Sequence, residues 1–111
     1  MPDHTVYAGI SPDTGKSMYT TRADAPGTYH RDAAKAFCAT EGGRVPTKGE
    51  LNALFQNRAA IGGFNETGSF PAGWYWSFSP SDSLYGWAQR FSDGLQDFSL
   101  RVNVSSLRCV R

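Results

Sequence analysis

The chain has 111 residues, of which 40% are hydrophobic and 14% aromatic, enough apolar material for one folded core but not for two. Its 11 basic and 10 acidic side chains are interspersed and give a formal net charge of +1. No concentrated basic patch therefore marks a nucleic-acid-binding surface. No apolar run approaches the roughly 20 residues of a membrane span. We expect a single domain over residues 1–111 that neither binds nucleic acid nor inserts into a membrane.

The first 28 residues predict a β-hairpin followed by a connector. Strand-like runs at 6–10 and 16–21 flank Ser11-Pro12-Asp13-Thr14-Gly15, whose proline, aspartate and glycine suit a tight turn. Pro26-Gly27 then indicates the connector.

A first amphipathic helix is expected from Thr28, as its N-cap, to a stop at Gly42-Gly43. Its spacing places four side chains on the core face (Ala33, Ala34, Phe37 and Cys38) and three on the opposite face (Arg31, Asp32 and Lys35).

A second helix is predicted after Pro46. Thr47 followed three residues later by Glu50 is a capping box, in which the hydroxyl and the carboxylate satisfy each other's backbone amides. The apolar spacing then continues for roughly three turns to Gly62-Gly63. The helical face consists of Leu51, Leu54, Phe55, Arg58 and Ile61.

The last third, Trp74–Arg111, reads as short antiparallel strands. Trp74, Trp76 and Phe78 alternate as in a strand with one buried face, so we place the tryptophans, including Trp87, in the core. Tyr75 and Tyr85 are then candidates for exposed contact. Asp93-Gly94 indicates a hairpin, and residues 95–104 alternate again. The order of elements predicts an α+β domain with two helices on small antiparallel sheets.

The two cysteines, Cys38 and Cys109, are best explained as a disulfide that closes a loop of about 70 residues. The alternative is two unpaired buried thiols. A bridge implies an oxidising compartment, whereas no signal peptide is visible at the start. Localisation is therefore open, with the cell surface or secretion expected if the chain belongs to a longer exported parent.

The elements GGRVPTKGEL, GWYWSFS, WAQRFSDG and SLRCVR, in this order over residues 29–111, resemble the bacterial branch of the C-type lectin-like fold. That branch occurs in the C-terminal domains of collagen-like adhesins, in invasin-like tips and in the variable proteins of diversity-generating retroelements. The last group fits best. Trp87, Gln89 to Gly94 and Ser106 to Arg111 match its framework positions.

This resemblance implies a diversified ligand-binding face within residues 80–104 that recognises a protein or a glycan. An ordinary half-buried strand is the alternative interpretation of the same alternation. The expected binding positions are Ser81, Asp82, Ser83, Leu84, Tyr85, Ala88, Leu95, Asp97, Phe98, Ser99, Leu100, Val102, Asn103 and Val104.

Two other functions stay open. A fixed-specificity adhesin tip or glycosaminoglycan-binding domain would gather sulfates on Arg90, Arg101, Arg108 and Arg111. An assembly role as a homo-oligomer would use tryptophan-rich edges.

We expect neither catalysis nor a cofactor. The formylglycine-generating oxidases resemble this fold, but they use an active-site cysteine pair and a metal, whereas both cysteines here are assigned to the bridge. His4 and His30 are the only histidines, too few for a zinc site. The Glu-Pro-Asn or Gln-Pro-Asp loop of calcium-dependent C-type lectins is missing. A structural cation on Asp82 or Asp93 is the one metal alternative left open.

Overall fold

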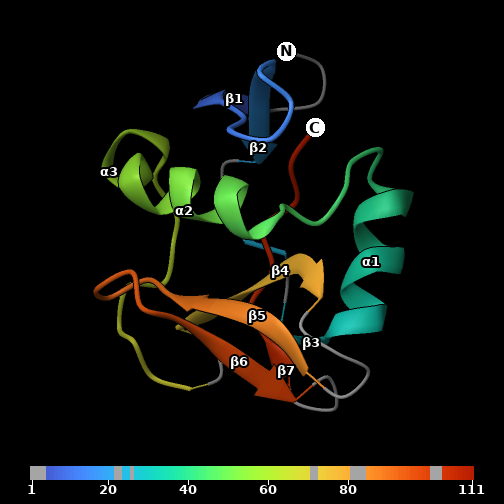
Figure 1. Cartoon of the computed structure of the whole chain (residues 1–111), viewed down its shortest axis with the longest axis vertical. Helices are drawn as coiled ribbons and strands as arrows, with labels where there is room; N and C mark the ends of the chain where they lie inside the picture. The colour runs from blue at the N-terminus through green and yellow to red at the C-terminus, as the bar shows by residue number, and fades with distance from the viewer. Residues whose placement is uncertain (1–4, 22–23, 26, 71–72, 81–84, 101–103) are drawn as a thin grey trace.

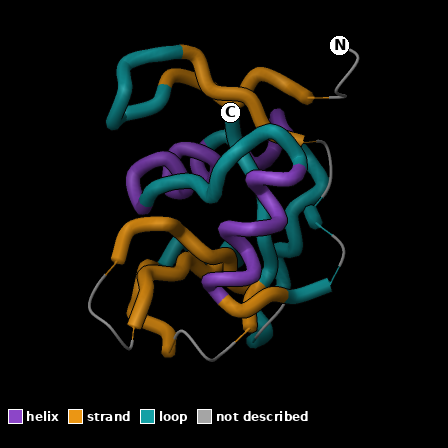
Figure 2. The backbone as a smooth tube through the Cα atoms, turned by 90° about the vertical axis from the view of Figure 1, so that its right-hand side faces the viewer, coloured by secondary structure: helices purple, strands orange, loops and turns teal. Residues whose placement is uncertain are grey.

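The computed structural model describes residues 5–21, 24–25, 27–70, 73–80, 85–100 and 104–111. Within these ranges three helices accompany several small antiparallel sheets, so the α+β class is confirmed. Figures 1 and 2 show the N-terminal hairpin at one end of the molecule and the three-stranded sheet at the other. In Figure 1, α2 (Lys48–Gln56) and α3 (Arg58–Ile61) lie between them, and α1 (Arg31–Thr40) lies along one side. None of the described helices is long and apolar enough to cross a membrane.

The predicted N-terminal hairpin is confirmed as β1 (Thr5–Ile10) paired antiparallel with β2 (Ser17–Thr21). Ser11 closes the turn, because its hydroxyl accepts from the amides of Asp13 and Thr14, each at 3.2 Å. A bulge interrupts the register between Tyr7 and Gly9. Gly9 has a positive φ of 105°, which glycine adopts without strain.

Helix α1 (Arg31–Thr40) begins later than predicted. Tyr29 and His30 form a short strand, β3 (Tyr29–His30), that pairs with β7 (Val104–Ser105), so Thr28 is not the N-cap. The predicted faces are also partly wrong. Arg31 is buried whereas Ala33 is exposed. Arg31 reaches across to strand β4 (Trp74–Pro80) and donates to the Phe78 carbonyl.

The capping box that opens α2 (Lys48–Gln56) is confirmed: the Thr47 hydroxyl accepts from the Glu50 amide and the Glu50 carboxylate from the Thr47 amide. The predicted second helix is, however, broken at Asn57 into α2 and the short α3 (Arg58–Ile61). Asn57 donates from its side chain to the Ala8 carbonyl at 3.2 Å, which ties the break to the hairpin.

The sheet of β4 (Trp74–Pro80), β5 (Tyr85–Arg90) and β6 (Gln96–Leu100) has β5 in the middle. The other edge of β4 is covered by a bridge from Tyr75 to Ser106, so β4 is flanked on both sides. The predicted hairpin at Asp93-Gly94 joins β5 to β6, and Gly94 has the expected positive φ of 83°.

Two hydrophobic clusters lie against β4. Tyr75 packs with α2 and the N-terminal hairpin, and Trp76 packs with α1 and the disulfide. Tyr75 and Trp76 are both 0% exposed, which corrects the prediction that Tyr75 is an exposed contact residue. Strand β4 is buried on both faces, so alternation along it does not separate core from surface. Trp74 and Trp87 are only partly buried.

The predicted Cys38–Cys109 disulfide is confirmed, with Cα atoms 5.5 Å apart. It fixes the C-terminal segment, residues 106–111, which runs between the sheet and the hairpin. Val110 bridges both Thr20 and Arg44. Arg111 exchanges backbone hydrogen bonds with Tyr19 at 2.8 and 2.9 Å. The segment is therefore held by three separate parts of the chain.

Candidate functional site

The predicted binding positions that the structure describes lie on β5, in the β5–β6 turn, on β6 and on β7. Strands β5 and β6 pair so that Tyr85 lies opposite Leu100 and Ala88 opposite Asp97. Pro80 lies opposite Gly86. Pro80, Tyr85 and Leu100, which flank the ranges 81–84 and 101–103, are therefore neighbours at one end of the sheet.

Apart from Ala88, the predicted positions fall into three groups. Leu95 is 45% exposed, Asp97 is exposed and Val104 is half-buried on β7. Ser81, Asp82, Ser83, Leu84, Val102 and Asn103 lie outside the described residues. Tyr85, Phe98, Ser99 and Leu100 are placed by their backbone pairing on β5 and β6.

Ala88, one of the predicted binding positions, is buried, so its assignment to the binding face is wrong. Its side chain is 1% exposed, and it packs in the same cluster as Trp76 and the disulfide. Because Ala88 lies directly opposite Trp76 in the β4–β5 register, both side chains point to the same buried face. Ala88 therefore belongs to the core and not to an exposed face.

Amide side chains hold the β5–β6 hairpin against α2. Gln89, which is 0% exposed, donates to the Asn52 side chain at 2.9 Å and to the Gly94 carbonyl at 3.0 Å. Gln96 on β6 donates to the Lys48 carbonyl at 3.1 Å. This network escaped the sequence analysis, although an isolated glutamine between Trp87 and Phe91 in a strand was a usable signal.

The turn itself is closed by an ion pair. Arg90 contacts both carboxylate oxygens of Asp93, at 3.0 and 2.6 Å. The hydrogen bond from Arg90 and a second one from the Leu95 amide lower the pKa of Asp93 to about 2. Asp93, a cation candidate from the sequence, is thus engaged within the turn. The described residues contain no group of three or more histidine, cysteine or acidic side chains that could hold a metal.

The arginines named for sulfate binding do not gather on one described surface. Arg108 is 0% exposed, and its Nε and Nη2 both donate to Oδ1 of Asp24, at 3.1 and 2.8 Å. Arg90 is bonded to Asp93, and Arg111 donates to the Glu41 carbonyl at 3.0 Å near the C-terminal end of α1. Arg101 lies outside the described residues.

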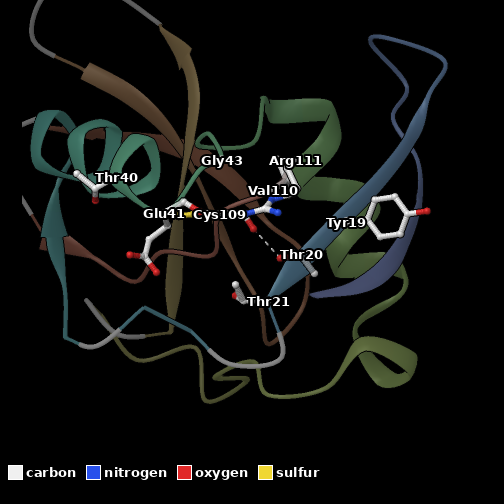
Figure 3. Close-up of a pocket in the computed structure, with 9 residues that line it drawn as sticks. All are labelled: Tyr19, Thr20, Thr21, Thr40, Glu41, Gly43, Cys109, Val110 and Arg111. Atoms are coloured by element: carbon white, nitrogen blue, oxygen red, sulfur yellow. Dashed lines mark hydrogen bonds between the residues drawn. The ribbon is translucent and has the colours of Figure 1, made fainter. Parts of the chain in front are cut away.

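A cavity of about 300 Å³ lies between β2, the end of α1 and the C-terminal segment. Figure 3 shows the residues that line it. Thr20 donates to the Cys109 carbonyl at 2.7 Å and Thr40 to the Phe37 carbonyl at 2.7 Å, so both hydroxyls are already used within the chain. The cavity is lined by Tyr19, Thr20, Thr21, Thr40, Glu41, Gly43, Cys109, Val110 and Arg111. None of these belongs to the expected face at residues 80–104, and the cavity lies toward the hairpin end of the molecule.

Comparison of the sequence with protein-family models and with curated proteins finds no match. A functional assignment therefore has to rest on the structural arrangement and on the short sequence motifs.

Proposed function

We propose that this chain is a ligand-binding module of the C-type lectin-like kind, with a diversified face within residues 80–104 that recognises a protein or a glycan. The disulfide from α1 to the C-terminal segment, the helices beside a small sheet and the order of the motifs support this assignment. The scaffold would act as an antibody framework does, by holding exchangeable side chains on a rigid support.

The observation that carries the proposal is that three framework-like positions are fully buried while two positions of the expected variable set are exposed. The framework-like positions Gln89, Phe91 and Arg108 are each 0% exposed. By contrast, Leu95 and Asp97 from the expected variable set are exposed on the β5–β6 hairpin. Exposed positions on a hairpin anchored from beneath tolerate exchange, whereas exchange of a buried hydrogen-bonded residue destabilises the fold.

The first test is to sequence the encoding locus together with its near copies in the same source. Adenine-specific differences confined to codons 80–104, with a template and a reverse transcriptase nearby, are the expected result. Invariant codons without a template would overturn diversification and favour an adhesin of fixed specificity, to be tested on a glycan array.

A protein-level test uses two display libraries of equal size. One randomises Leu95, Asp97 and the other expected positions except Ala88, and the matched control randomises Gln89, Phe91 and Arg108. We expect the first library to keep folded, protease-resistant members and to yield binders on panning, and the control to lose folding. Equal loss of folding in both libraries would contradict the proposed face.

A further inference from the structure

A second cavity, of about 270 Å³, lies between α1, the segment that enters α2, and the end of β4. Its apolar surface comes from Ala39, Val45 and the ring of Phe78, which is 38% exposed. Ligand cavities usually start at about 300 Å³, so this one suits a ligand of fragment size. The remaining lining residues are Lys35, Gly43, Arg44 and Thr47.

The backbone of Phe78 is fixed on both sides, which keeps its ring at the cavity. Its amide donates to the Pro46 carbonyl at 2.7 Å, and its carbonyl accepts from the Arg31 guanidinium. The ring is also flanked by cations, with Arg31 Cζ 4.9 Å and Lys35 Nζ 5.4 Å from its centroid. The apolar surface is therefore preformed beside positive charge.

The charges around the cavity are unequally compensated. Arg44 is paired with the buried Glu50 carboxylate, and Asp13 accepts from the Thr47 hydroxyl, so both carboxylates are engaged. Lys35 has no carboxylate partner among the described residues, and its ammonium group lies over the Phe78 ring. The Lys35 ammonium group thus lies beside an apolar cavity, and no carboxylate in the described part of the chain is paired with it.

We propose that this cavity binds a small organic carboxylate that carries an apolar ring or short chain. The apolar part would lie on Phe78 and Val45, and the carboxylate would pair with Lys35. Charge complementarity selects the anion, because an ammonium ligand would meet the positive charges of Lys35 and Arg31 and an alcohol would lack the ion pair. This proposal is independent of the face at residues 80–104.

Three ligands with the same ring test it: 3-phenylpropionate, 3-phenylpropanol and 3-phenylpropylamine, titrated into isotope-labelled protein and followed by NMR. We expect saturable carboxylate binding with a Kd of about 1 mM, which is typical of so few atoms. The shifts should centre on Lys35, Ala39 and Val45. The alcohol should bind up to about fivefold more weakly, and the amine most weakly.

Variants of Lys35 test how much its charge contributes to binding, and a variant of Ala39 tests the contribution of the cavity's shape. Lys35→Met should reduce carboxylate affinity to that of the alcohol, whereas Lys35→Arg should retain it. Lys16→Met, on the exposed hairpin turn, is the matched control and should change nothing. Ala39→Leu narrows the cavity from an exposed helix position and should abolish binding of all three ligands, with the melting temperature confirming that the variant folds.

Equal affinity for the three ligands, or carboxylate binding unchanged in Lys35→Met, would overturn the proposal. A final arm uses N-acetylglycyl-phenylalanine, which has the same ring and carboxylate at the end of a peptide. Binding of the peptide without binding of phenylpropionate would also overturn it, in favour of a peptide-docking site.

Discussion

Tyr75 and Trp76 are neighbours on β4, yet their fully buried side chains pack into different hydrophobic clusters. Tyr75 also carries a polar network, since its hydroxyl donates to Asp24 and accepts from the Asn65 amide at 2.7 Å. Burial and the bond to Asp24 raise the pKa of Tyr75 far above its ordinary value, so the hydroxyl stays protonated. Asp24 in turn binds the buried Arg108.

Tyr75→Phe should lower the free energy of unfolding by about 1–2 kcal/mol, because it leaves the Asn65 amide and one Asp24 oxygen without their partner. Urea denaturation measures the change. Tyr19→Phe is the control, since the Tyr19 ring is 37% exposed at the edge of the hairpin, and it should be nearly neutral. Equal effects of the two variants would show that the network does not stabilise the fold.

The ionisation of the Glu50 carboxyl should make the free energy of unfolding depend on pH in the acidic range. Burial alone would raise its pKa, but hydrogen bonds from Arg44, Ser11 and the Thr47 amide outweigh burial and lower the pKa to about 2 from an ordinary value of 4.5. A carboxyl with a lowered pKa contributes stability that is complete above pH 4.5 and is lost as pH falls toward 2. We expect a contribution of about 3 kcal/mol at neutral pH.

Glu50→Gln should flatten the stability profile in this window while destabilising the protein at neutral pH. Denaturant midpoints measured from pH 2 to 7 for both proteins provide the test. Asp93→Asn, at the exposed turn, is the comparison and should alter the profile less, because solvent screens its pair with Arg90. If the stability of Glu50→Gln falls with decreasing pH as steeply as that of the wild type, this assignment is contradicted.

Removing the disulfide should cost about 4 kcal/mol, because the bridge spans a sequence separation of 71 residues. The double variant Cys38→Ala and Cys109→Ala avoids a lone thiol and should melt well below the wild type. Reductant should lower the melting temperature of the wild type toward that of the variant and leave the variant unchanged. A wild-type melting temperature insensitive to reductant and to the substitutions would refute the stabilising role.

Alanine substitutions at Gly94 and Gly15 allow the cost of backbone strain to be compared with the cost of steric overlap. Both have positive φ, 83° and 73°, but a Cβ on Gly94 would lie 2.6 Å from a Phe55 ring carbon, whereas one on Gly15 would meet nothing within 4 Å. Gly15→Ala should cost about 1 kcal/mol, and Gly94→Ala should cost more. Thermal unfolding of the two variants gives the difference, and equal costs would show that Phe55 moves aside freely.

Features that depend on a few residues close together in the sequence could be predicted. The turn at residues 11–15, the Thr47–Glu50 capping box and the Asp93-Gly94 hairpin each depend on a few adjacent residues, and all three are confirmed. The disulfide followed from having only two cysteines, one of them near the end of the sequence. The face at residues 80–104 stays a prediction, of which Leu95 and Asp97 are exposed as expected.

The errors arise where tertiary contacts override local pattern. Tyr75 looked exposed by alternation, but β4 has a cluster on each face. Arg31 looked solvated on a helix, yet it reaches the Phe78 carbonyl on a strand 47 residues away. Similarly, the break at Asn57 depends on its bond to Ala8, 49 residues earlier in the chain. No window of local sequence contains these partners.

Residues 104–111 complete the fold, so they determine when the chain can finish folding during its synthesis. This stretch supplies the partner of β3, the bridge to Tyr75, the second cysteine and the backbone bonds to Tyr19. A nascent chain on the ribosome therefore lacks these contacts until the stretch has left the exit tunnel, and we expect folding to be completed only once it has emerged. Shortening the chain by these residues would expose Trp76 and leave Cys38 unpaired, making the product a target for aggregation and proteolysis.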